Sequence, residues 1–151
     1  MSTRCITTVR SRWPEQEWET LAVIYRHSDG YPAGQGALLF GFLNNLQVVN
    51  GITGNMPKRY VNGPGRLASL LVCHMQAEGH SPSLMGAVVD CGQEFHYQVN
   101  IEYGSNGGEV SVAIFDGPVT FFGMGGGACK NEIFNGSVEA MGAFLAGINA
   151  E

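Results

Sequence analysis

The spacing of hydrophobic residues changes along the chain, and this change limits the folds open to it. Residues 3–11 alternate with a period of two, and residues 18–25 do so again after a turn at Pro14 and Glu15, which predicts a β-hairpin. Other segments repeat apolar residues every three or four positions, which is typical of a helix with one buried face. We expect such helices over 33–46, 66–78 and 137–149.

The remaining segments favour β-structure. We expect further strands over 87–91, 94–103, 109–115 and 119–122. The glycine-rich stretch 104–108 predicts the turn of a second hairpin. An order of two strands, two helices, several strands and one helix is typical of an α+β fold. We therefore expect a single domain over residues 1–151, with an antiparallel sheet and helices packed on one face.

Composition excludes several classes of protein. Hydrophobic residues make up 44% of the chain, enough for a core without disulfide or metal support. The net charge is −5 and the eight Lys and Arg residues form no run, which argues against general nucleic-acid binding. No signal peptide and no apolar run of about 18 residues is visible, so we expect a cytoplasmic protein without membrane contact. The four cysteines include no C-x-x-C pair, so we expect buried thiols and no metal site.

Residues 25–36 carry the densest group of functional side chains. The segment reads Tyr25-Arg-His-Ser-Asp-Gly-Tyr-Pro-Ala-Gly-Gln-Gly36 and lies between a predicted strand and a predicted helix. Ligands are commonly held at such junctions, where backbone N–H groups are available. We expect Arg26, as an exposed loop cation, to bind a phosphate or carboxylate, His27 to contact a ligand oxygen and Tyr31 to stack. Asp29 is either a turn or cap residue or a ligand contact.

Two further segments supply candidates. Lys58, Arg59 and Arg66 bracket a long glycine-rich stretch, and with Tyr60 they form a second-choice site, although each cation is equally well read as a surface charge. Glu94 and Tyr97 lie on a predicted strand, where Glu94 either faces solvent or accepts a hydrogen bond from a ribose or an amine. Between these segments, His74 falls on the apolar stripe of a helix and is interpreted as a core residue.

Three motifs carry a resemblance to a known family. They are Tyr25-x-His27-x-Asp29-Gly-Tyr-Pro32-x-Gly34-x-Gly36, then Asn62-Gly-x-Gly65 before a helix that ends in His74, then Asp90-Cys-Gly-Gln-Glu94-x-x-Tyr97. From about Thr3 to Phe115 the chain resembles a family of small, mostly uncharacterised proteins encoded by phages, prophages and bacteria. The resemblance implies no established reaction. It does imply a setting, because short accessory phage proteins are often counter-defence factors, and some of these are sponges for nucleotide immune signals.

A ligand-binding protein is therefore the first functional expectation. The predicted site comprises Arg26, His27, Asp29, Tyr31, Arg59, Tyr60, Glu94 and Tyr97, with no catalytic residue, cofactor or metal. The expected partner is a small phosphorylated ligand, either a cyclic dinucleotide or an ADP-ribose derivative, in the cytoplasm of the bacterial host. One alternative is a nucleotide phosphodiesterase or transferase with His27 and Glu94 as acid and base. A second is a protein–protein inhibitor of a host factor, and homo-oligomerisation is left open.

Overall fold

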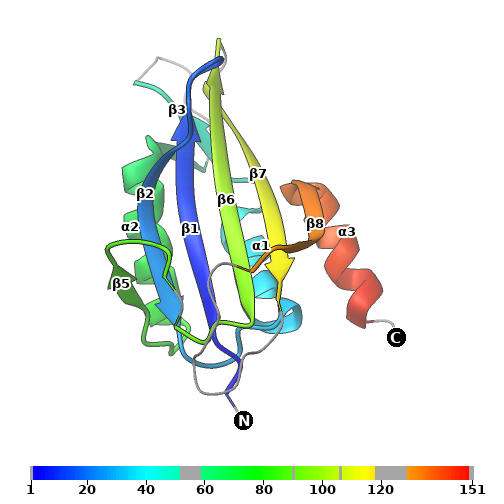
Figure 1. Cartoon of the computed structure of the whole chain (residues 1–151). Coiled ribbons are helices and arrows are strands. Elements are labelled where there is room, and N and C mark those ends of the chain that lie inside the picture. Colours follow the sequence, from blue (N-terminus) through cyan, green and yellow to red (C-terminus); the bar gives the residue numbers. More distant parts are fainter. Residues whose placement is uncertain (1, 52–58, 90, 106, 118–128, 150–151) are drawn as a thin grey trace.

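A curled, mixed β-sheet makes up most of the described part of the chain, and three short α-helices accompany it there (Figure 1). The structure is a computed structural model that describes residues 2–51, 59–89, 91–105, 107–117 and 129–149. Its strands are β1 (Cys5–Arg12), β2 (Glu19–Arg26), β3 (Gln47–Val49), β4 (Tyr60–Asn62), β5 (Ser83–Met85), β6 (Phe95–Gly104), β7 (Gly107–Asp116) and β8 (Asn131–Ser137). Its helices are α1 (Ala37–Leu43), preceded by a π-helical turn η1 (Pro32–Gly36), then α2 (Pro64–Ala77) and α3 (Val138–Asn149).

The described strands follow the order β4-β3-β7-β6-β1-β2-β5, and β8 also pairs with β7. β1 and β2 form the predicted antiparallel hairpin, in which Cys5 lies opposite Arg26. β6 and β7 form the second antiparallel hairpin, which closes where Gly104 meets Gly107. Between these hairpins, β1 and β6 run parallel along their whole length, beginning where Cys5 lies beside Phe95. The sheet is thus two hairpins joined through a central parallel pair.

The predicted antiparallel sheet with helices packed on one face is wrong. The sheet is mixed, because β1–β6 and β3–β4 are parallel pairs, and it curls like half of a barrel (Figure 1). The physical reason is that alternation along one strand tells which side chains share a face, and says nothing about which strand becomes its neighbour. The strand expected over 87–91 is also wrong, since 87–89 and 91 have no strand structure and 90 lies outside the described residues. The strand expected over 119–122 lies outside them as well.

The hydrophobic core draws buried side chains from the strands and from each helix, including Val9, Ile24, Leu39, Leu71 and Met141. The predicted helix over 33–46 is divided, because its first turn is η1 and α1 ends at Leu43 before β3 begins. The last helix begins as expected at Ser137, whose hydroxyl accepts a hydrogen bond of 3.0 Å from the backbone N–H of Ala140.

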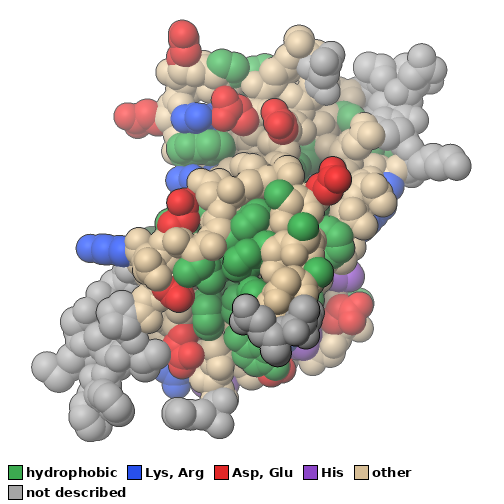
Figure 2. All heavy atoms as spheres, turned by 90° about the vertical axis from the view of Figure 1, so that its right-hand side faces the viewer, with side chains coloured by type: hydrophobic (Ala, Val, Ile, Leu, Met, Phe, Trp, Pro, Cys, Tyr) green, Lys and Arg blue, Asp and Glu red, His purple; other side chains and the backbone are tan. Residues whose placement is uncertain are grey.

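The side of the molecule that carries β8 and α3 gathers hydrophobic side chains, as the space-filling view of that side shows (Figure 2). Phe134 of β8 and Phe144 of α3 pack there with ring centroids 5.0 Å apart. α3 has a single acidic residue in its first turn, Glu139, and no basic residue in its last. Within the described part of the chain, no helix is both long and apolar enough to cross a membrane.

Candidate functional site

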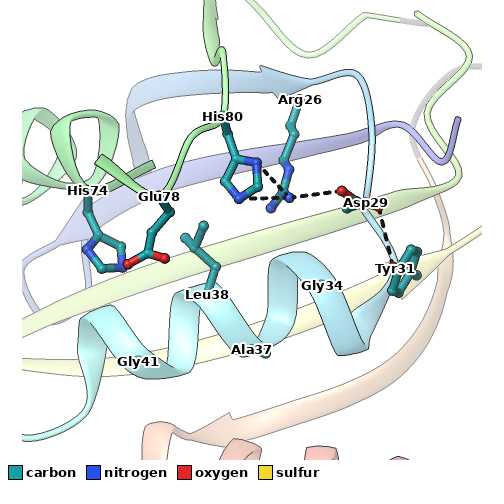
Figure 3. A pocket seen from close by; sticks show the side chains of 10 residues that line it. All are labelled: Arg26, Asp29, Tyr31, Gly34, Ala37, Leu38, Gly41, His74, Glu78 and His80. Atoms are coloured by element: carbon teal, nitrogen blue, oxygen red, sulfur yellow. Dashed lines mark hydrogen bonds and ion pairs between the residues drawn. The ribbon is translucent and has the colours of Figure 1, made fainter. Parts of the chain in front are cut away.

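A cleft of about 510 Å³ opens where β2 ends, α1 begins and α2 ends (Figure 3). Ten residues line it: Arg26, Asp29, Tyr31, Gly34, Ala37, Leu38, Gly41, His74, Glu78 and His80. They come from the end of β2 with the loop after it, from η1 and α1, and from the last turn of α2 with the residue that follows Gly79. The cleft therefore lies beside the segment 25–36 that the sequence singled out.

The loop between β2 and η1 is attached to the rest of the protein by two hydrogen bonds of Gly30. The buried hydroxyl of Tyr97 on β6 donates a hydrogen bond of 2.6 Å to the Gly30 carbonyl, and the Gly30 N–H donates to the Thr3 carbonyl at 2.9 Å. A Cβ at position 30 would lie only 2.7 Å from the Cβ of Cys5, so only glycine fits this close approach. Burial raises the pKa of the Tyr97 hydroxyl well above its usual range, so Tyr97 stays a donor at physiological pH. Tyr97 thus supports the cleft from beneath and does not line it.

Arg26 is the last residue of β2 and is almost fully buried, with 4% of its surface exposed. The expectation of an exposed loop cation is wrong, because β2 continues through this residue and pairs it with Cys5. Its Nη1 donates a hydrogen bond of 2.7 Å to Oε1 of Gln35, and Nε2 of Gln35 donates to Oγ1 of Thr7 at 3.0 Å. These buried bonds fix the direction of the guanidinium.

The rest of the Arg26 guanidinium has little compensation for its charge. Its Nε is buried and has no hydrogen-bond partner among the described residues. Its Nη2 lies 3.8 Å from Oδ2 of Asp29, a carboxylate whose side chain is 55% exposed. A buried cation with so few acceptors is unfavourable unless another anion approaches it.

The contact between Arg26 and His80 does not compensate the charge of the guanidinium. Nη2 of Arg26 lies 3.1 Å from both ring nitrogens of His80. An atom equally close to both nitrogens cannot lie in the ring plane, because the ring carbon between them would be too near. Nη2 therefore lies over the face of the imidazole, away from the in-plane lone pair that a neutral histidine offers. The contact is better described as a cation over a ring than as a well-directed hydrogen bond.

The walls of the cleft differ in character. On one side Tyr31 is 43% exposed and donates a hydrogen bond of 3.4 Å to Oδ1 of Asp29. On the helix side, the lining residues from η1 and α1 recur at three- and four-residue spacing, so they share one face. Most are small, and nothing lies within 4 Å of where a Cβ of Gly41 would be. On the third side lie His74, in the last turn of α2, and Glu78, the C-cap residue that follows this helix four positions later.

Several residues predicted for the site lie elsewhere. His27 is bonded to the Tyr25 hydroxyl at 2.9 Å, and Arg59 donates to the carbonyls of Phe42 and Asn44 at 2.6 Å each, which caps the end of α1. Tyr60 is exposed on β4. Glu94 is half-buried before β6, where its backbone N–H donates to the Arg4 carbonyl. None of these four predicted residues lines the cleft, and Lys58 lies outside the described residues.

The structure adds three lining residues that sequence reasoning missed as a group: His74, Glu78 and His80. The spacing of His74 and Glu78, followed by a helix stop at Gly79, was the available signal. In the described ranges, no three or more His, Cys, Asp and Glu side chains are arranged to hold a metal ion. Comparison of the chain with family models, curated proteins and solved structures finds no match.

Proposed function

We propose that this protein captures a small anionic ligand in the cleft, a nucleotide-derived signal, and holds it without changing it. The observation that supports this most is the buried guanidinium of Arg26, which lines the cleft and whose carboxylate partner among the described residues, Asp29, lies 3.8 Å away. A ligand anion would complete its charge balance. A hydrogen bond to a charged group contributes about 1.5–3 kcal/mol, enough to make Arg26 the main anchor.

The other lining residues suit a nucleotide. Tyr31 offers an aromatic ring at the rim, on which a base can stack. A cleft of about 510 Å³ is within the usual size for small-molecule sites. The resemblance to phage and prophage proteins supports a role as a sponge for an immune signal, by analogy of setting alone.

Capture is favoured over turnover by where the proposed acid and base lie. An acid–base pair has to reach the same substrate. His27 is bonded to Tyr25 and Glu94 precedes β6, and neither residue lines the cleft that Arg26 lines. The phosphodiesterase or transferase alternative therefore lacks support from this cleft.

The first experiment separates holding from turnover. The protein is incubated with a panel that includes cyclic dinucleotides, ADP-ribose and nucleoside monophosphates, then separated from free ligand and denatured. Recovery of one intact ligand in stoichiometric amount is the expected result. Recovery of an altered ligand would indicate an enzyme, and retention of none would contradict the proposal.

Matched variants then locate the site. Tyr31 and Tyr60 are both 43% exposed, but only Tyr31 lines the cleft. Tyr31→Ala should weaken binding of the retained ligand, while Tyr60→Ala should leave it unchanged. Arg26→Met keeps an unbranched apolar stem in the place of the Arg26 stem and removes the guanidinium, and should weaken binding about 10- to 100-fold per folded molecule. Because Arg26 is buried, the folded fraction is measured for each variant. Equal effects of the two tyrosine variants would contradict this placement.

A further inference from the structure

The number of cations in the cleft limits the charge of its ligand. Arg26 is the single Lys or Arg among the ten lining residues, whereas Asp29 and Glu78 contribute two carboxylates. Arg59, which was expected to supply a second cation for a pyrophosphate, caps α1 instead. Arg26 carries one positive charge, and the Asp29 carboxylate already lies 3.8 Å from it, so the cleft accepts a singly charged ligand more readily than a doubly charged one. A second charge on the ligand would lie near Asp29 or Glu78, where like charges repel.

The position of Arg26 limits the shape of the ligand. In the close-up view, Arg26 and His80 lie in the middle of the cleft (Figure 3). Asp29 and Tyr31 lie to one side of them, and Leu38, His74 and Glu78 to the other (Figure 3). The anion site is thus central, so a ligand that fills the cleft extends away from its anion in two directions.

The two sides can each receive a flat group. On one side the exposed ring of Tyr31 is available. On the other, the helix wall carries Ala37, Leu38 and Gly41, and open space at Gly41 leaves room against α1. The ring of His74 is held there by packing on Phe42, with ring centroids 5.4 Å apart.

From this geometry we propose that the cleft selects a phosphodiester, whose phosphate carries one charge and a nucleoside on either side, over a phosphomonoester or a pyrophosphate. This inference rests on the proposed function and makes it more specific. Of the two ligand classes expected from the sequence, ADP-ribose carries a pyrophosphate and a cyclic dinucleotide carries two diester phosphates, so the charge argument favours neither of them and points to a linear dinucleotide with a single phosphodiester. A diester places its single charge on Arg26, and each nucleoside then occupies one side of the cleft.

The test compares ligands that differ in charge and in shape. Binding is measured by calorimetry at pH 8 for the linear dinucleotide adenylyl-adenosine, for AMP, whose phosphate is then doubly charged, and for ADP-ribose. Adenylyl-adenosine should bind at least tenfold more tightly than either of the others. If AMP or ADP-ribose binds equally or more tightly, the diester inference is overturned while ligand capture stands. If none of the three binds and no other anion is retained, both proposals fail.

A charge variant tests the reason for the selectivity. Glu78 is exposed, so Glu78→Gln removes a carboxylate from the cleft without disturbing the core. It should improve the binding of doubly charged AMP more than the binding of singly charged adenylyl-adenosine, so that the preference for the diester shrinks. Glu19→Gln is the matched control, because Glu19 is also exposed and lies at the start of β2 away from the lining residues. An equal change in both variants would overturn the charge argument.

Discussion

Replacing Tyr97 with phenylalanine would remove one hydroxyl and leave a buried carbonyl without its donor. Tyr97 is 0% exposed, and its hydroxyl donates to Gly30 at 2.6 Å. Leaving a buried acceptor unsatisfied costs about 1–3 kcal/mol. For a domain of this size, each kcal/mol shifts Tm by about 2–4 °C, so Tyr97→Phe should lower Tm by about 2–12 °C. Because Gly30 belongs to the loop beside the cleft, ligand affinity should fall as well.

Urea denaturation followed by circular dichroism measures the change in the free energy of unfolding. Tyr103→Phe is the matched control, since Tyr103 is also on β6 and 7% exposed, and it stacks on Trp13 at 4.9 Å through its ring. Removing that hydroxyl should change stability by less than about 0.5 kcal/mol. If the two variants lose equal stability, the hydrogen bond to Gly30 is not what holds the loop.

Burial, and then the positive charge of Arg10, lower the pKa of His96 to about 4. His96 in the unfolded chain takes up a proton below about pH 6.5, whereas His96 in the folded protein does so only near pH 4. The free energy of unfolding should therefore be highest above pH 6.5 and fall by up to about 3 kcal/mol as the pH drops to 4. In urea titrations, His96→Gln should show a smaller change of the free energy of unfolding with pH. Gly30→Ala should lower Tm strongly, because the added Cβ would lie 2.7 Å from the Cβ of Cys5. Gly41→Ala should raise Tm slightly, because the added Cβ would meet nothing within 4 Å. A comparable loss of Tm in both variants would contradict the close-approach argument. Burial raises the pKa of the Cys5 thiol to about 12, whereas Cys73 is exposed. The native protein should therefore react with a thiol reagent at Cys73 and not at Cys5. Early labelling of Cys5 in a peptide map would contradict this prediction.

Local patterns predicted the elements whose partners are close in sequence. The alternation in residues 3–11 and 18–25 and the turn between them indicated the β1–β2 hairpin, because a tight turn brings its own partner. The parallel pair β1–β6 left no comparable signal, since its partners are separated by about ninety positions. β8 was missed for another reason: its sequence Asn131–Ser137 is polar and contains a glycine, so neither period stands out.

In the candidate site too, the residues that are close in sequence could be predicted, and those brought together by packing could not. Arg26, Asp29 and Tyr31 were found because they crowd one short segment, and the structure brings them to one cleft. The other lining residues His74 and His80 come from the last turn of α2 and from the segment just after it, and their approach to Arg26 depends on how that helix packs near β2. The burial of Arg26 could not be read from the sequence either, since it depends on β2 extending by one pair to meet Cys5.

The parallel pair at the centre of the sheet also sets an order for folding. β1 can pair with β2 as soon as the short turn between them forms, but the other edge of β1 stays unpaired until β6 has been made. At about 5–20 residues per second, a ribosome needs roughly 5–20 s to make the intervening chain. During that interval the edge of β1 has free N–H and C=O groups, which are a template for pairing with other chains. Tyr97 belongs to β6, so its hydrogen bond to Gly30, which holds the loop beside the cleft, can form only after β6 pairs with β1.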